Sequence, residues 1–289
     1  MLVLFADTDM DLTPSVAREY GYHLISMPYT LNGETFYPFE DGRPVDHKAF
    51  YDTLRGGALP TTSAISPARY VQYFEPHFAA GDDILYVHFS AAMSATFDNM
   101  HVALRDLAEK YPERKLYEID TKGITIISYN IACEIGEMYK AGKSVEEMLA
   151  WAEREVDHFA LYFFAEDLRF FHRSGRVSGL SAFMGTLIGV RPIIYTNEEG
   201  KMVKVGTERG RQNAVAHLLR RVREQGRDLD RHRIVIGHTD APEIADQIAE
   251  ALRAEFGASL NIVSFPVNPT AGGHCGPGGV GVSFYASHR

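Results

Sequence analysis

Cysteine is scarce in this chain, and long apolar runs are missing. Only two cysteines, Cys133 and Cys275, occur in 289 residues, so disulfides cannot hold together a fold of this size. No apolar run approaches the roughly 20 residues that a membrane helix needs. The first residues turn acidic at Asp7 and lack the basic region of a signal peptide. We therefore expect a cytoplasmic protein in a reducing compartment.

Clusters of positive charge and common catalytic motifs are also missing. The formal net charge is −9 and no run of Lys and Arg exceeds two residues, whereas proteins that bind nucleic acid present a basic face. The sequence contains no Gly-x-Ser-x-Gly elbow, no Walker loop and no His-Glu-x-x-His pair. We therefore expect no nucleic-acid partner, no metal or other cofactor, and no catalytic residues of the chain's own.

What the sequence does contain is an alternation of short apolar runs with helical periodicity. Residues 1–158 alternate the two in the order typical of βαβ units, which favours a three-layer α/β domain around a mainly parallel sheet. Residues 159–289 combine helices with a hairpin around Asn197–Gly200, which favours an α+β domain with a mixed sheet. We therefore predict an α/β protein of two domains, 1–158 and 159–289.

Local signals predict several elements within these domains. Thr13-Pro14 is typical of an N-cap followed by proline in the first helical turn, and Ser144 with Glu147 forms a capping box. Apolar residues and the glycine content predict one strand over His23–Leu31 and a glycine-rich loop over Ala271–Gly281.

Two segments rich in hydroxyl groups stand at predicted helix starts in the first domain. They contain Thr61, Thr62, Ser63 and Ser66 in one case, and Ser90, Ser94 and Thr96 in the other. A helix N-terminus with free N–H groups and a Ser or Thr side chain can bind a carboxylate or a phosphate. Simple capping accounts for any one of these residues, but two such groups in one half of a sheet point to an anion site.

Two other segments have both a functional and a structural interpretation. Gly276, Gly278 and Gly281 have the spacing of a dinucleotide fingerprint, but they lead into a strand instead of opening a helix, which argues against that role. Leu168–Arg176 carries three arginines and a histidine, as in a solvated charged face or in an anion-facing patch.

The carboxylates Asp7, Asp9 and Asp11 follow the first predicted strand. Alternating carboxylates can hold a hard cation, so a metal-dependent phosphatase using Asp7 and Asp9 is an alternative function. The next residues, Met10-Asp11, depart from the phosphatase motif. The structural interpretation of these aspartates is that they are turn and cap residues.

Several segments, in order along the chain, resemble those of the DegV family. Asp7–Leu12 is similar to the family's Asp-Ser-x-x-Asp-Leu, Pro60–Ser63 to its Pro-x-Thr-Ser, and Ser90–Thr96 to its Ser-Ser-x-Leu-Ser-Gly-Thr. Leu168–Ser178 resembles Leu-x-x-Leu-x-x-Gly-Gly-Arg-Ile-Ser, and His274–Gly278 fits the later pattern. Because the match spans nearly the whole chain, it is more specific than any single motif.

The resemblance implies a two-domain α/β protein that holds a long-chain fatty acid, such as palmitate, in a buried tunnel. It implies that Thr62 and Ser94 hydrogen-bond the carboxylate. The other residues that it implies near the head group or a kinase face are Ser63, His274, Arg176 and Arg209. The protein would be a carrier in lipid transport or metabolism, not an enzyme, and would present the carboxylate to a separate fatty acid kinase. A regulatory module whose lipid signals to another protein is a further alternative.

Three positions depart from the family pattern. Ala91 replaces a serine, Ala95 replaces a glycine next to Ser94, and Ser174 replaces a glycine. Thr62 and Ser94 are retained, so the expected head-group contacts remain. The residues that we expect along a tunnel are Met27, Phe89, Met93, Phe97, Ile126 and Ile131.

Overall fold

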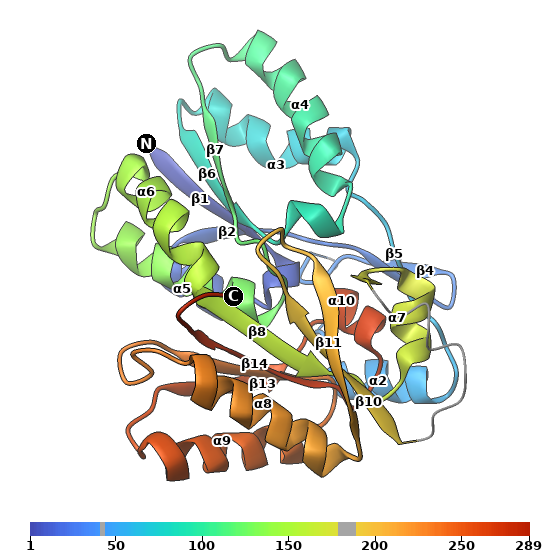
Figure 1. Cartoon of the computed structure of the whole chain (residues 1–289). Coiled ribbons are helices and arrows are strands. Elements are labelled where there is room, and N and C mark those ends of the chain that lie inside the picture. Colours follow the sequence, from blue (N-terminus) through green and yellow to red (C-terminus); the bar gives the residue numbers. More distant parts are fainter. Residues whose placement is uncertain (41–43, 179–188) are drawn as a thin grey trace.

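The structure, a computed structural model, describes residues 1–40, 44–178 and 189–289 (Figure 1). One sheet, called sheet A, has four parallel strands in the order β2-β1-β6-β7. These strands are β1 (Leu2–Asp7), β2 (Tyr22–Ile25), β6 (Asp83–His88) and β7 (Leu116–Asp120). The structure therefore confirms the predicted parallel sheet in the first part of the chain.

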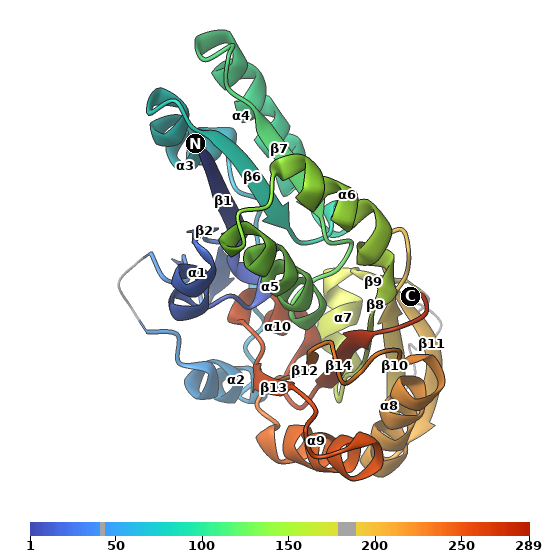
Figure 2. The ribbon, with the colours of Figure 1, turned by 90° about the vertical axis from the view of Figure 1, so that its left-hand side faces the viewer.

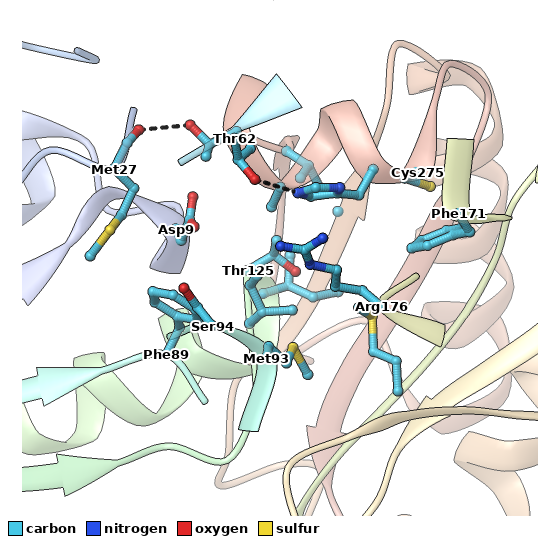
Figure 3. Close-up of a pocket in the computed structure, with 18 of the residues that line it drawn as sticks. Asp9, Met27, Thr62, Phe89, Met93, Ser94, Thr125, Phe171, Arg176 and Cys275 are labelled. Carbon is cyan, nitrogen blue, oxygen red and sulfur yellow. Dashed lines mark hydrogen bonds between the residues drawn. The ribbon is translucent and has the colours of Figure 1, made fainter. Parts of the chain in front are cut away.

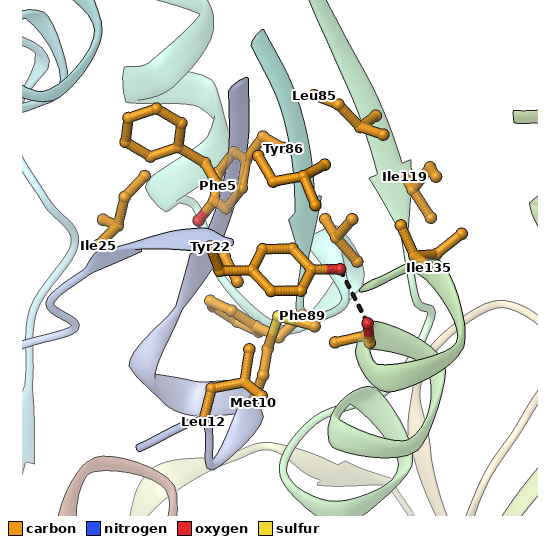
Figure 4. Packing of buried hydrophobic residues seen from close by; sticks show 14 of the residues in the cluster. Phe5, Met10, Leu12, Tyr22, Ile25, Leu85, Tyr86, Phe89, Ile119 and Ile135 are labelled. Carbon is orange, nitrogen blue, oxygen red and sulfur yellow. Dashed lines mark hydrogen bonds between the residues drawn. The ribbon is translucent and has the colours of Figure 1, made fainter. Parts of the chain in front are cut away.

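Helices cover both faces of sheet A (Figures 1 and 2). On one face lie α3 (Pro67–Ala79) and α4 (Thr96–Lys110), and on the other lie α1 (Pro14–Tyr20), α5 (Ile126–Lys140) and α6 (Val145–Glu155). A sheet covered on both faces needs apolar side chains on both. On the α3 face Phe5 and Tyr86, paired on neighbouring strands, both pack against Phe74. On the other face the Tyr22 hydroxyl donates to the carbonyl oxygen of Ala132 on α5 at 2.9 Å (Figure 4).

A second sheet, called sheet C, is mixed, as predicted. Its strand order is β13-β12-β14-β8-β10-β11-β9, with parallel pairs β12–β13 and β9–β11 and antiparallel pairs elsewhere. Its strands are β8 (Phe159–Phe164), β9 (Val177–Ser178), β10 (Val190–Thr196), β11 (Met202–Arg209), β12 (Ile234–His238), β13 (Ile262–Pro266) and β14 (Val280–Tyr285).

The two faces of sheet C pack against different halves of the chain. One face contacts α8 (Arg211–Gln225) and α9 (Pro242–Phe256), and the other contacts α5. The alternation of side chains along β8 follows this division: Tyr162 and Phe164 join the core with α8 and α9, whereas Leu161 packs with the residues of sheet A. Helix α5 is therefore shared between the two large sheets.

Short elements complete the fold around these layers. A small sheet in the order β4-β3-β5 joins β3 (Tyr29–Leu31), β4 (Glu34–Phe36) and β5 (Thr61–Thr62). The remaining helices are α2 (His47–Arg55), α7 (Leu168–Ser174) and α10 (Pro269–Cys275), with short 3-10 turns η1 (Thr8–Met10), η2 (Ala91–Met93) and η3 (Val156–His158). Within residues 1–40, 44–178 and 189–289, no helix has the length and apolar character to cross a membrane.

The local signals for caps and hairpins are confirmed. Thr13 caps α1, Ser144 and Glu147 form a capping box on α6, and β10 pairs with β11 across the Asn197–Gly200 turn. The division into domains at residue 158 stays a prediction. Every strand of sheet A precedes that residue and every strand of sheet C follows it, but one core cluster contains side chains from both sides.

Two predicted elements are wrong. The predicted strand His23–Leu31 is two strands in different sheets, because β2 pairs with β1 whereas β3, which follows Pro28, pairs with β4 and β5. The predicted loop Ala271–Gly281 begins as a helix, because α10 extends to Cys275 and is capped by Asn268.

Candidate functional site

A cavity of about 320 Å³ lies where the carboxyl ends of sheet A meet the inner face of sheet C (Figure 3). The segments after β1 and β6 contribute Asp9 and Phe89, and Thr125 begins α5 beside them. Strands β8 and β14 of sheet C contribute Leu161 and Val280. Open α/β sheets bind ligands beyond the carboxyl ends of their strands, and this volume falls in the lower part of the range of small-molecule pockets.

Both predicted hydroxyl segments reach this cavity. Thr62 lies on β5, which pairs with β3, and its hydroxyl is 3.1 Å from Nε2 of His274 on α10. Ser94 ends the η2 turn just before α4, and its Oγ accepts a hydrogen bond from the backbone N–H of Thr96 at 3.2 Å. Ser63 also lines the cavity. The structure thus brings Thr62, Ser94, Ser63 and His274 to one site.

His274 is a neutral hydrogen-bonding group at this site. Burial, and then the positive charge of Arg176, lowers the pKa of His274 to about 4. Arg176 follows α7, is itself exposed, and points into the cavity (Figure 3). At neutral pH the guanidinium of Arg176 therefore supplies positive charge at this side of the cavity, and His274 supplies a neutral ring.

Arg209 does not line the cavity formed by the described residues. It ends β11 opposite Val190, whereas the other end of β11, at Met202, pairs with Val177 beside Arg176. Arg176 and Arg209 therefore lie at opposite ends of one strand, and the structure does not bring them together.

An open groove adjoins the cavity on the side of Ser94. The cavity and the groove share Met93, Ser94, Ala95 and Arg176 in their linings, so the two are continuous there. The three departures from the family pattern all line this outer groove: Ala91, Ala95 and Ser174. These changes therefore alter the outside of the site, next to Ser94, and leave Thr62 unaffected.

Much of the remaining lining of the cavity is apolar, and we call this part the apolar wall. Four predicted tunnel residues line it: Met27, Phe89, Met93 and Ile126. Phe97 instead lines the outer groove and packs against His88, and Ile131 belongs to the buried core. The sequence did not identify the apolar residues that the second half supplies, which include Leu161, Phe163, Phe171, Met202 and Val280.

The three aspartates after β1 differ in their surroundings. Asp7 accepts hydrogen bonds from the Tyr86 hydroxyl and the N–H of Phe89, both at 3.2 Å, and Asp11 accepts two from Asn268, both at 2.8 Å. Asp9 lines the cavity, and its Oδ1 has no hydrogen-bond partner among the described residues.

The phosphatase alternative gains no support from this arrangement. Both oxygens of Asp7 accept hydrogen bonds from the protein. Oδ1 accepts from the N–H of Asp9 at 3.0 Å, and Oδ2 accepts from the Tyr86 hydroxyl and the N–H of Phe89. Three potential metal ligands of the His, Cys, Asp or Glu type do not cluster anywhere in the described ranges.

Sequence reasoning did not place several polar residues in the cavity wall, among them Asp9 and Thr125. The sequence pattern assigns Asp9 to a turn, a cap or a metal site and gives Thr125 no role. Thr125 has φ 56°, a conformation that costs energy for a β-branched residue, and its N–H donates to the carbonyl oxygen of Asp9 at 2.7 Å. The available signal was their position, because Asp9 follows β1 and Thr125 opens α5 at the carboxyl edge of sheet A.

The comparisons with known proteins agree on one family. A family model described as an uncharacterised protein of the DegV family matches residues 1–287. A DegV domain-containing protein of Clostridium perfringens is 28% identical over 282 residues, which cover 98% of this chain and 96% of the relative.

Solved structures of similar proteins have the same fold. One, described as showing fatty-acid binding of a DegV family protein from Thermus thermophilus, has a TM-score of 0.86 at 23% identity and covers 99% of both chains. Another, a DegV family protein from Eubacterium eligens loaded with heptadecanoic acid, has a TM-score of 0.84 at 20% identity and covers 99% of this chain and 100% of the other.

Proposed function

Because the chain belongs to the DegV family, we propose that it binds a long-chain fatty acid, such as palmitate, in the cavity between its two large sheets. The carboxylate accepts hydrogen bonds from the hydroxyls of Thr62 and Ser94, with Ser63, His274 and Arg176 close to the head group. The acyl chain lies along the apolar wall. The proposal agrees with the fatty acids that similar solved structures are described as binding.

One observation carries this proposal: a single cavity joins a hydroxyl-rich side to an apolar side. Thr62 and Ser94 come from different segments, and both line the space that Leu161 and Phe163 close from sheet C. A fatty acid has the same division, with an anionic end and a long hydrocarbon. A phosphorylated sugar or a nucleotide would leave the apolar wall without a matching surface.

The energetics of lipid burial fit a site with few charges. Each buried methylene contributes about 0.8 kcal/mol, so a chain of about fifteen offers roughly 12 kcal/mol before the costs of association. The head-group residues then need to orient the carboxylate and not to supply most of the affinity. Neutral donors on Thr62, Ser94 and His274, with one guanidinium on Arg176, are sufficient for that task.

The proposed role is that of a cytoplasmic carrier in lipid metabolism. The groove outside Ser94 and Arg176 gives a second protein access to the head group, and we propose a separate fatty acid kinase as that partner. Arg209 is not part of this proposed face, because it lies at the other end of β11 from the residues beside Arg176.

Native mass spectrometry of the protein purified from a lipid-replete host tests the binding proposal. The expected result is a mass increment that matches a long-chain fatty acid, lost after organic extraction and restored by added palmitate. Recovery of no lipid, together with no binding of added palmitate, would refute the proposal.

A reconstitution tests the carrier role. The loaded protein, ATP and a fatty acid kinase should form acyl phosphate only when both proteins are present. Formation of acyl phosphate by this chain without a kinase would contradict the assignment as a carrier.

A further inference from the structure

Asp9 is a buried carboxyl group that the protein leaves without a partner. Its side chain is 6% exposed, it lines the cavity, and its Oδ1 makes no hydrogen bond within the described residues. A buried polar atom without a partner costs roughly 1–3 kcal/mol, and such atoms usually meet water or a ligand. The cavity is the space from which that partner can come.

The neighbouring carboxyl groups show that this turn can satisfy an aspartate when the fold requires it. Asp7 accepts three hydrogen bonds, and Oδ1 of Asp11 accepts two from Asn268, although Oδ2 of Asp11 is buried without a partner among the described residues. Asp9 receives none of these donors, although it lies between the two in sequence and is also buried. The difference is that Asp9 alone among the three lines the cavity.

The surroundings of Asp9 favour its neutral form. Burial, and then the nearby Asp7 and Asp11 carboxyls, raises the pKa of Asp9 well above its ordinary value. A protonated carboxyl carries an O–H group that needs an acceptor. In this neutral form Asp9 presents a hydrogen-bond donor to the cavity.

The position of Asp9 relative to the other polar residues indicates which part of a ligand it meets. Figure 3 shows Asp9 between Met27 and Ser94, facing the space into which Thr62 and Arg176 also point. Thr62, Ser94 and Arg176 are polar residues of the proposed head-group side, so Asp9 lies with that side of the cavity, next to the apolar Met27.

We propose that Asp9 is a further head-group residue, which as a neutral carboxylic acid donates a hydrogen bond to the carboxylate of the bound fatty acid. This inference rests on the proposed function. The two carboxyl groups hold one proton between them. This proton stays on Asp9, and the ligand binds as the anion. No bond other than this hydrogen bond is formed.

The proton requirement makes binding depend on pH. Above the pKa of Asp9, each ligand bound must be accompanied by one proton, so affinity falls by up to about tenfold per pH unit. The other titratable or charged groups that face this region are Asp7, Asp11, Tyr86, His88, His274 and Arg176. Ionisation of Asp7 and Asp11, whose pKa values are raised to about 7, weakens the binding of an anion more than that of an alcohol. The test therefore needs a second ligand that lacks the carboxylate and an Asp9 variant that keeps both neighbours.

The test compares palmitate with hexadecan-1-ol on delipidated protein, by calorimetric titration from about pH 6 to about pH 9. In the wild type, the ratio of palmitate affinity to alcohol affinity should fall as pH rises, because ionised Asp9 repels a carboxylate but accepts a hydrogen bond from an alcohol. In Asp9→Asn, whose amide donates at every pH, this ratio should fall less, only by the part that ionisation of Asp7 and Asp11 causes. In Asp9→Ala, palmitate should bind about tenfold more weakly at the lowest pH.

Asp11→Asn is the matched control. It neutralises another buried carboxyl of the same turn, keeps the oxygen that accepts from Asn268, and does not alter the cavity lining. It should retain the fall in the affinity ratio, moved to lower pH because one negative neighbour of Asp9 is gone. Thermal unfolding checks that each variant is folded.

Three outcomes separate this inference from the proposed function. A ratio that falls clearly less in Asp9→Asn than in the wild type and in Asp11→Asn supports the inference. An Asp9→Asn variant whose ratio falls as in the wild type overturns it, while the fatty-acid function stands. Failure of the wild type to bind palmitate at any pH overturns both.

Discussion

The two walls of the cavity come from different halves of the chain and differ in construction. The wall at sheet A carries Asp9 on η1, Thr62 on the short strand β5 and Ser94 at the end of η2, together with apolar side chains such as Met27. The wall at sheet C is made largely of regular strands, which carry Leu161 and Phe163. Loops at strand ends leave backbone and side-chain donors free to meet a ligand. Strands alternate their side chains between two faces and can give one face wholly to apolar groups.

The difference teaches that the residues that orient the head group and the strands that supply much of the apolar contact lie largely in different parts of the fold. Polar groups sit where the backbone can hold them at fixed positions, with Thr62 paired on β5 and Ser94 at the end of η2. Apolar groups sit where contact area is greatest. Changes in one wall should therefore alter mainly head-group recognition, and changes in the other mainly the gross binding energy.

The largest expected effect concerns the buried carboxyls beneath the polar wall. Burial raises the pKa of Asp11 from its ordinary value of 3.8 to about 7, so between these values the folded state holds a proton that the unfolded state has lost. Stability due to Asp11 is present below the lower value and is lost as pH rises through the window. As pH rises through this window, the free energy of unfolding of Asp11→Asn should increase relative to that of the wild type. The increase should be more than about 1 kcal/mol per pH unit, to about 4 kcal/mol in total.

Urea unfolding of the two delipidated proteins across this range measures that difference. The test compares the free energies of unfolding of the two proteins at each pH, and not the pH dependence of one protein alone. His274, whose pKa is lowered to about 4, makes stability rise with pH and so opposes the effect of Asp11 in either protein. A stability difference that does not change with pH would show that Asp11 is ionised in the fold.

Obstructing the apolar wall should have the next largest effect. Leu161 is buried, lines the cavity, and faces the sheet A side of sheet C. Leu161→Trp should fill part of the acyl space, and displacing about four methylenes costs roughly 3 kcal/mol, or about a hundredfold in palmitate affinity. Leu161→Met, of similar volume, should bind within a few fold of the wild type.

Calorimetric titration with palmitate measures both variants, and a melting curve confirms that each is folded. A folded Leu161→Trp protein with wild-type affinity would mean that the acyl chain does not pass this wall.

The parts of the fold that the sequence predicted well depend on local chemistry. Thr13 with Pro14, and Ser144 with Glu147, start helices through contacts that lie within one turn, and the Asn197–Gly200 turn fixes its own hairpin. The split of residues 23–31 depends on distant partners, since β3 pairs with Thr61 and Thr62. Pro28 was the available clue, because proline supplies no N–H to a sheet.

Helix α10 shows how packing can reverse a local tendency. Its glycines favour a loop, but Asn268 and Pro269 give it a good helix start. A side chain at Gly272 would meet the Tyr51 hydroxyl at 1.9 Å, so the bare backbone lets α10 and α2 approach closely. The glycine-rich composition therefore reflects close packing, which the sequence alone does not distinguish from flexibility.

The candidate site was predictable in part. Thr62, Ser94 and His274 could be named from the resemblance, and they line one cavity, although their contacts with a ligand remain a proposal. The position of Asp9 could not be inferred in this way. Three adjacent carboxyls look alike in sequence, and they differ because donors from β6 and Asn268 reach two of them and not the third.

Removing a hydroxyl from the polar wall should have an intermediate effect. A hydrogen bond to a charged group is worth roughly 1.5–3 kcal/mol, so Thr62→Val and Ser94→Ala should each weaken palmitate binding by about tenfold or more. Thr61→Val is the matched control for Thr62, because Thr61 is the exposed neighbour on β5 and does not line the cavity.

Palmitate titration, with unfolding curves as a check on folding, distinguishes these variants. Unchanged affinity in both Thr62→Val and Ser94→Ala would remove the two residues from the head-group site. A loss in Thr61→Val as large as that in Thr62→Val would assign the effect to β5 as a whole.

The smallest expected effect concerns one of the contacts that join the two halves at the cavity. Ser90 is fully buried, and its hydroxyl donates to the carbonyl oxygen of Gly200, in the hairpin of sheet C, at 2.8 Å and also accepts from the N–H of Ala92. Ser90→Ala should lower the free energy of unfolding by about 1 kcal/mol. Because Ser90 caps the η2 turn that ends at Ser94, palmitate affinity should fall a few fold as well.

Ser66→Ala provides the control for that prediction. Ser66 caps α3 through the N–H of Arg69 and does not line the cavity, so its loss should cost a similar free energy of unfolding and leave palmitate affinity unchanged. If Ser66→Ala and Ser90→Ala reduce affinity equally, the effect follows from general destabilisation. A decrease confined to Ser90→Ala would show that sheet C helps to hold the hydroxyl of Ser94 in place, so the separation of the two walls is incomplete at this one contact.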